Sequence, residues 1–142
     1  MREILFRGKR TDNGEWAEGS YCADAIEQLY GIGSGVDGFI RRFNPDERRT
    51  YMFEVERETV GQYTGLTDKN GRKIFEGDIV ERGGRIWLVE YSNKYGQFMM
   101  TTYTEKGVSW SRSFDLIPPD WCEVIGNIYD NPELLKGGVE NG

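Results

Sequence analysis

Hydrophobic and polar residues alternate over short stretches along most of the chain, and turn-forming residues separate these stretches. One such stretch runs from Arg2 to Arg10, and a second runs from Glu15 to Tyr21 after the dipeptide Asn13-Gly14. Alternation indicates a strand with one buried face, and Asn-Gly readily adopts the positive φ angles of a tight hairpin turn. The pattern therefore predicts an N-terminal β-hairpin.

A second hairpin is predicted within residues 39–55. Asn44 and Pro45 suit the first two positions of a β-turn, and residues on either side favour strands. Beyond the turn, Tyr51, Phe53 and Val55 occupy alternate positions, so their side chains would lie on one face of the strand. This apolar face is predicted to be core.

From Glu58 onward the predicted strands lie closer together along the chain. They cover residues 59–65, 73–82, 85–91, 98–104, 109–116 and 122–129, with turn residues such as those of 68–71 between them. Five or six short strands within about 70 residues favour a small closed barrel, because closure removes exposed strand edges. An SH3-like barrel matches this size.

The C-terminal segment is predicted to contain one short helix over residues 131–136. Asn131 is a suitable capping residue, Pro132 favours the first helical position, and Glu133 is favourable in the first turn. The fold is therefore predicted to be mainly β. It comprises an N-terminal β-hairpin region in residues 1–57, a small SH3-like β-barrel with a terminal helix in 58–136, and a flexible tail in 137–142. Residues 22–38 are compatible with a short helix or with a loop.

The net charge of −6 is spread evenly, because residues 1–60 and 61–142 each contain nine Lys and Arg against twelve Asp and Glu. Nucleic acid is bound chiefly through Lys and Arg, so an evenly acidic chain disfavours this partner unless a local patch overrides the average. The sequence shows neither a signal peptide nor a membrane-spanning stretch, which makes the cytoplasm the expected compartment. The lone Cys22 and Cys122 are interpreted as reduced thiols there.

Candidate catalytic and metal-binding patterns are weak. The chain has no histidine, and therefore lacks the commonest general base and metal ligand. The turn after Asp68 fails the spacing of a calcium loop, and the glycines at 31–35 fail that of a phosphate loop. Glu76 and Asp78 would share one face of a regular strand, as paired carboxylates must for acid–base work. We expect no catalytic residues, no metal and no cofactor.

One local patch departs from the acidic average. The predicted hairpin at residues 41–51 combines four arginines with two aromatic residues, namely Arg41, Arg42, Phe43, Arg48, Arg49 and Tyr51. A single-stranded nucleic acid or an acidic protein segment could dock on such a hairpin through charge and stacking. Asp46 and Glu47 in the turn oppose this charge, so an ordinary ion-paired hairpin is the alternative.

Four tryptophans and eight tyrosines exceed what a small core needs. Aromatic residues are enriched at interfaces, so self-association is compatible with this surplus. Trp87 lies in the apolar run of residues 86–89 and is predicted to be core.

Three blocks of sequence resemble the YopX family of phage and prophage proteins. The first block is the N-terminal hairpin within residues 2–21. The second covers residues 58–80 and includes Thr64-Gly65-Leu66-Thr67-Asp68, and the third covers residues 124–135. The resemblance implies a phage or prophage origin and an N-terminal β-rich region followed by an SH3-like barrel. It implies no activity and no functional residues.

These observations favour a phage-encoded accessory protein of uncharacterised activity that acts as a noncatalytic protein-interaction module, with a host or phage protein as partner. The alternative is a single-stranded nucleic-acid-associated protein that uses the hairpin from Arg41 to Tyr51. A third hypothesis is a carboxylate-dependent enzyme built on Glu76 and Asp78.

Overall fold

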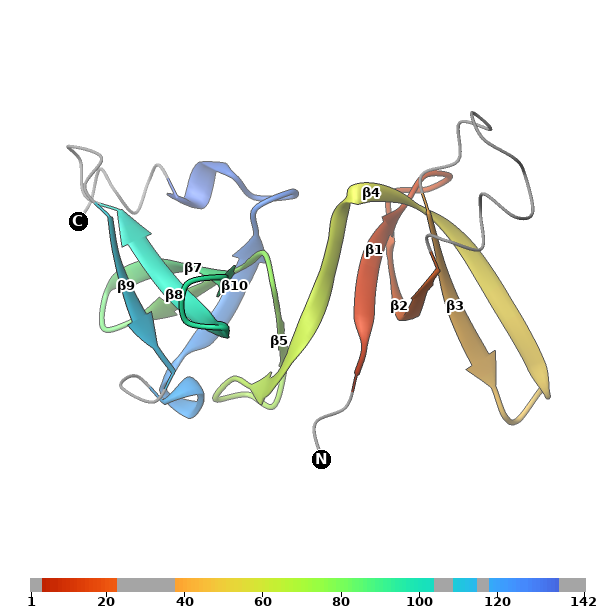
Figure 1. Cartoon of the computed structure of the whole chain (residues 1–142), viewed down its shortest axis with the longest axis horizontal. Helices are drawn as coiled ribbons and strands as arrows, with labels where there is room; N and C mark the ends of the chain where they lie inside the picture. The colour runs from red at the N-terminus through yellow and green to blue at the C-terminus, as the bar shows by residue number, and fades with distance from the viewer. Residues whose placement is uncertain (1–3, 23–37, 104–108, 115–117, 136–142) are drawn as a thin grey trace. The chain divides into compact units, whose positions relative to one another are not determined.

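The computed structural model describes residues 4–22, 38–103, 109–114 and 118–135. Within these residues it contains ten β-strands, one 3-10 helix and a short helical segment at residues 133–135. The chain divides into two compact units, Met1–Tyr63 and Thr64–Gly142, and each unit is considered by itself (Figure 1). The prediction of a mainly β protein with one short C-terminal helix is confirmed.

The N-terminal unit is built on four antiparallel strands. They are β1 (Phe6–Arg10), β2 (Trp16–Cys22), β3 (Gly38–Asn44) and β4 (Arg49–Thr67). Each strand pairs with the next, and β1 also pairs with β4. The last of the four strands is therefore hydrogen-bonded to the first. β4 achieves this because its first part pairs with β3 and a later part pairs with β1.

Both predicted N-terminal hairpins are confirmed. Gly14 has a φ of 72°, and its N–H donates to the carbonyl of Arg10 at 3.0 Å, which closes the first turn. In the second turn, the side-chain oxygen of Asn44 accepts hydrogen bonds from the N–H groups of Asp46 and Glu47. The prediction that one strand ends before residue 58 and another begins after it is wrong, because β4 runs through this position without interruption.

The core of the N-terminal unit is small. Ala17, Ile40 and Val55 are buried, and partly buried side chains of Phe6, Tyr21, Phe53 and Val60 pack against them. Of the predicted core face of β4, only Val55 is fully buried, whereas Phe53 and Tyr51 are half-buried. Burial decreases along β4 toward the β3–β4 turn, so the far half of this hairpin extends beyond the core.

The C-terminal unit contains an antiparallel sheet in the order β10-β6-β7-β8-β9, while β5 pairs with β4. The strands are β5 (Lys73–Phe75), β6 (Asp78–Arg82), β7 (Arg85–Ser92), β8 (Gln97–Tyr103), β9 (Ser109–Ser113) and β10 (Glu123–Asn127). The 3-10 helix η1 (Pro119–Trp121) precedes β10. The core cluster consists of Ile74, Val80, Trp87, Val89, Phe98, Met100, Phe114, Cys122 and Val124, so the prediction for Trp87 is confirmed.

Two predicted strands of this unit differ from the structure. The strand predicted over 73–82 is split into β5 and β6, because Glu76 and Gly77 form a turn in which Gly77 has a φ of 92°. The strand predicted from Ser109 ends at Ser113. The SH3-like barrel stays a prediction.

Some predictions fall outside the described residues. These concern the segment at 23–30, the glycines at 31–35 and the tail at 137–142. Among the residues that the structure does describe, no helix has the length and apolar character needed to cross a membrane. Both cysteines are free thiols, and burial raises the pKa of the Cys122 thiol despite the opposing charge of Arg82.

Candidate functional site

The β3–β4 hairpin carries all six residues of the predicted patch, but it distributes them over two faces. In the register, Arg42 lies opposite Tyr51, and Arg41 lies opposite Met52. Residues directly opposite each other on antiparallel strands project from the same face, and successive residues alternate. One face therefore carries Arg42, Arg49 and Tyr51, the other carries Arg41 and Phe43, and Arg48 lies in the turn.

The first face forms an alternating ladder of arginines and aromatic rings. The rings of Tyr51 and Phe53 are stacked, with centroids 6.1 Å apart and an interplanar angle of 6°. The guanidinium carbons of Arg10 and Arg42 lie 4.7 and 5.1 Å from the Phe53 centroid, and that of Arg49 lies 5.2 Å from the Tyr51 centroid. We call these five residues the ladder face.

Two residues of the ladder face could not be assigned from the sequence. Phe53 was predicted to be core, and Arg10 lies on β1, far from the hairpin in sequence. The pairing of β1 with β4 places Arg10 opposite Val55, within reach of the Phe53 ring. The register in which β1 pairs with β4 brings Arg10 and Phe53 together. The local sequence pattern around either residue does not predict this pairing.

The acidic side chains near the ladder face neutralise only part of its charge. Asp12 accepts two hydrogen bonds from Arg10, at 2.7 and 2.9 Å, and this interaction lowers the pKa of the Asp12 carboxyl. The Tyr51 hydroxyl donates to Glu47, which raises the pKa of the Tyr51 phenol. Within the described residues, neither Arg42 nor Arg49 forms an ion pair.

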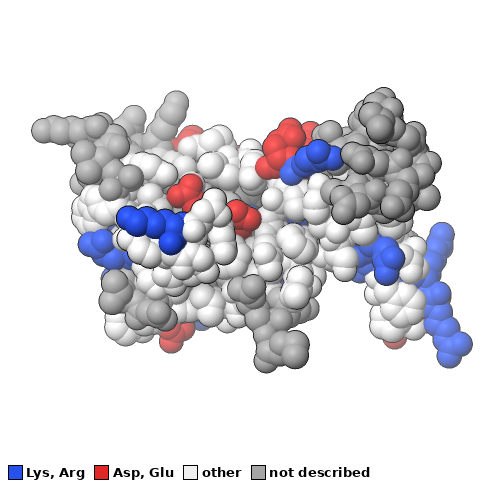
Figure 2. All heavy atoms as spheres, in the orientation of Figure 1, with Lys and Arg blue, Asp and Glu red and all other residues white. Residues whose placement is uncertain are grey.

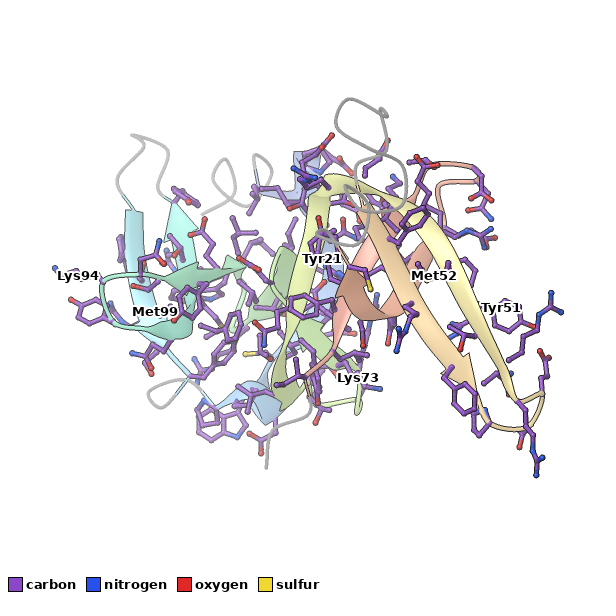
Figure 3. All side chains as sticks on the ribbon, turned by 45° about the vertical axis from the view of Figure 1, so that its right-hand side comes forward. Tyr21, Tyr51, Met52, Lys73, Lys94 and Met99 are labelled. Carbon is purple, nitrogen blue, oxygen red and sulfur yellow. The ribbon has the colours of Figure 1, made fainter. Side chains whose placement is uncertain are left out.

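The opposite face of the hairpin exposes large apolar side chains. Phe43 is 60% exposed and Met52 is 43% exposed, with Arg41 beside them on the same face. We call Phe43 and Met52 the apolar tip. Figure 2 shows basic side chains at the lower right, where Figure 1 places the β3–β4 turn, and Figure 3 labels Tyr51 and Met52 on this hairpin.

The two carboxylates considered for catalysis have different environments. Asp78 is buried, and its Oδ2 accepts a hydrogen bond of 2.7 Å from the N–H of Phe75. Glu76 is half-buried and lines a groove of about 210 Å³ together with Glu90, Tyr91 and other residues, but not with Asp78. The expected shared strand face is absent, because the turn at residues 76–77 separates the two positions.

Asp68 has a structural role that the sequence did not reveal. Its Oδ1 accepts hydrogen bonds from the N–H groups of Asn70 and Arg72, and its Oδ2 accepts one from the N–H of Val124, all at 2.9 Å. Burial acts to raise the pKa of this carboxyl, but the three backbone donors and the charge of Arg72 together hold the pKa below its ordinary value. Asp68 thus joins the turn at residues 68–71 to the start of β10.

No group of three or more His, Cys, Asp or Glu side chains is arranged to hold a metal ion in the part of the chain that the structure describes. Exposed side chains of the described residues present charge and apolar surface. In the N-terminal unit these are the ladder face and the apolar tip.

The family model described as YopX protein matches residues 5–136 of this chain. The chain belongs to the YopX family. Among solved structures, protein EF1440 from Enterococcus faecalis is similar, with 24% sequence identity, coverage of 95% of this chain and 99% of that chain, and a TM-score of 0.48. The search of curated proteins found no match. The membership rests on nearly the whole chain and brings no activity with it.

Proposed function

We propose that this YopX-family protein is a phage- or prophage-encoded accessory protein that acts in the bacterial cytoplasm as a noncatalytic protein-interaction module. The β3–β4 hairpin is its contact element, and a host or phage protein is its partner. The observation that carries this proposal is the apolar tip, where Phe43 and Met52 lie exposed on one face of a hairpin that extends beyond its core.

The composition of the hairpin supports this proposal. Aromatic residues, Met and Arg are enriched at the centres of protein interfaces, and exposed apolar patches often mark such sites. The apolar tip supplies one Phe and one Met, and Arg41 lies beside them. A partner with an apolar pocket and an acidic border matches this face.

The proposal is tested by comparing the wild-type protein with the double variant Phe43→Ser, Met52→Ser in quantitative pull-downs from bacterial host lysate. Loss of a central apolar contact commonly weakens an interface by about 2 kcal/mol or more, so recovery of the partner should fall more than about tenfold. The affinity for the purified partner is then measured directly with both proteins. Thermal melting checks that the variant remains folded.

Tyr95→Ser provides a matched control. Tyr95 is 59% exposed, almost the same as Phe43, but it lies in the C-terminal unit outside the hairpin. We expect this variant to recover the partner as well as wild type does. Equal recovery by the hairpin double variant, or the absence of any reproducible partner, would contradict the proposal. Sedimentation at increasing concentration identifies the case in which the partner is a second copy of this chain.

A second candidate is binding of single-stranded nucleic acid by the same hairpin. The exposure of Arg41, Arg42, Arg48 and Arg49 together favours it, since guanidinium groups beside aromatic rings suit phosphates and bases. Fluorescence anisotropy with a single-stranded oligonucleotide at low salt should detect binding that the fourfold arginine-to-alanine variant loses. No binding, or binding that this variant retains, would remove the candidate. The carboxylate-dependent enzyme receives no support from the positions of Glu76 and Asp78.

A further inference from the structure

A second cluster of arginines and aromatic residues lies in the C-terminal unit. Arg82 ends β6 and Arg85 begins β7, and the two lie directly opposite each other in the register of these strands. Like charges at directly opposite positions destabilise an antiparallel pair. The β6–β7 turn therefore places two positive charges together at a cost to the stability of the sheet.

Tryptophan side chains from two other segments meet these arginines. The guanidinium carbon of Arg82 lies 5.0 Å from the ring centroid of Trp121 in η1. The guanidinium carbons of Arg85 and Arg112 lie 4.6 and 5.4 Å from the ring centroid of Trp110 in β9. We call these five residues the arginine–tryptophan row.

The row lies where the core of this sheet ends. Two positions inward from Arg82 and Arg85, Val80 pairs with Trp87, and both side chains are buried in the core cluster. By contrast, Trp110 is 36% exposed and Trp121 is 59% exposed. Core packing accounts for Val80 and Trp87 but does not account for two tryptophans held at the surface beside three arginines.

Within the described residues, the positive charge of the row has no ion-pair partner. None of the three arginines forms an ion pair within the described residues, and the Nε atom of Arg82 is buried there without a hydrogen-bond partner. The nearby carboxylate of Glu81 accepts a hydrogen bond from the N–H of Gly84, at 3.0 Å, within the turn. Within the described residues, the three guanidinium charges thus have no carboxylate partner, while the Nε of Arg82 is buried and does not face an incoming group.

We propose that the arginine–tryptophan row binds an acidic segment of a partner protein, with carboxylates as the recognised groups. A guanidinium that stacks on an indole ring keeps its in-plane N–H donors directed outward, and these donors match a carboxylate in a bidentate manner. The Trp110 ring already contacts two guanidinium groups, so it offers little surface to a nucleobase. This site goes beyond the proposed hairpin contact because it lies in the other unit of the chain.

Fluorescence anisotropy tests this site with a fluorescein-labelled oligoglutamate peptide at low ionic strength. We expect the wild-type protein to bind the peptide and the double variant Arg82→Lys, Arg85→Lys to bind it about tenfold or more weakly, because lysine keeps the charge but loses the bidentate, stacked geometry. A lysine variant that binds like wild type would mean that charge alone is responsible, and would overturn the proposal. So would a wild-type protein that does not bind the peptide.

Lys94→Gln is the matched control. The Lys94 ammonium lies 5.2 Å from the Tyr95 ring centroid, so this variant removes a cation stacked on an aromatic ring of the same unit but outside the row. It should bind the peptide like wild type, and an equal loss of binding would contradict the site. The hairpin variant Phe43→Ser, Met52→Ser should also bind normally, so the two proposals can fail separately. Tighter binding of single-stranded oligothymidylate than of the peptide would overturn the assignment to an acidic protein segment.

A measurement on the wild-type protein keeps the proposal testable if the lysine variant unfolds. The indole N–H resonances of Trp110 and Trp121 should shift during titration with the peptide, while those of Trp16 and Trp87 should move little. Single Trp→Phe variants assign the four signals. Unchanged Trp110 and Trp121 signals at saturating peptide would overturn the proposal.

Discussion

Asp68 illustrates how one buried carboxylate stabilises a turn and a strand together. It is 4% exposed and accepts three backbone hydrogen bonds, two from its own turn and one from Val124. Hydrogen bonds to a charged acceptor are stronger than those between neutral groups. Asp68 therefore contributes to the stability of both the turn and the start of β10.

Asp68→Asn should lower the free energy of unfolding by about 1–3 kcal/mol, because its amide nitrogen cannot accept the hydrogen bond from Val124. Chemical denaturation at neutral pH measures this change. Asp46→Asn is the control, since Asp46 is exposed in the β3–β4 turn and should change stability little. A similar loss in both variants would contradict the role of Asp68.

The same variant should change the pH dependence of stability. The folded pKa of Asp68 lies below its unfolded value of about 3.9, so its contribution is fully present above the unfolded value and disappears as the pH falls through the folded pKa. Wild type should therefore lose more stability than Asp68→Asn between neutral pH and acid. Parallel melting-temperature curves against pH for the two proteins would contradict this prediction.

At the scale of elements, close strand pairing in the N-terminal unit depends on positions without side chains. A Cβ atom on Gly19 would lie 2.2 Å from the carbonyl oxygen of Arg41, which belongs to the neighbouring strand β3. Contacts this short force the backbone to move. By contrast, Gly71 has a φ of 81° in its turn, and a Cβ atom there would meet nothing within 4 Å.

Gly19→Ala should therefore destabilise the protein more than Gly71→Ala does. The second variant carries the cost of a left-handed backbone, about 1–2 kcal/mol, whereas the first must also displace β2 from β3. Denaturation midpoints measure both effects. Equal losses, or a smaller loss for Gly19→Ala, would show that the two strands separate easily.

At the scale of the whole chain, each compact unit has its own hydrophobic cluster. Ile40 is fully buried in the cluster of the N-terminal unit, and Ile74 is fully buried in that of the C-terminal unit. The two isoleucines provide matched probes, because truncation of either to Ala removes the same atoms. A loss of about 2–5 kcal/mol is typical for such a change.

Hydrogen exchange measured by mass spectrometry should report these losses separately. Ile40→Ala should reduce protection chiefly within residues 6–63, and Ile74→Ala chiefly within residues 64–135, because each variant weakens one core. Loss of protection along the whole chain in both variants would mean that the two units unfold as one cooperative structure.

Local sequence determined the strands and turns because their causes are local. Asn13-Gly14 and Asn44 form the predicted turns, and alternation correctly placed most strands. It did not reveal that β4 is continuous or that a turn at Gly77 separates β5 from β6, because pairing across the sheet and a positive φ override the pattern there. Arginines at 41–49 were found as a patch, but only strand register divided them between two faces.

The contacts that define the ladder face and the arginine–tryptophan row were decided by tertiary structure. Arg10 joins the ladder face through the pairing of β1 with β4, and Trp110 and Trp121 reach Arg85 and Arg82 from separate segments. The sequence did determine that its aromatic residues exceed the needs of a core. Which of them stay at the surface, and which cations they meet, depends on the packing of residues distant in the chain, and periodicity along a single strand carries no information about such partners.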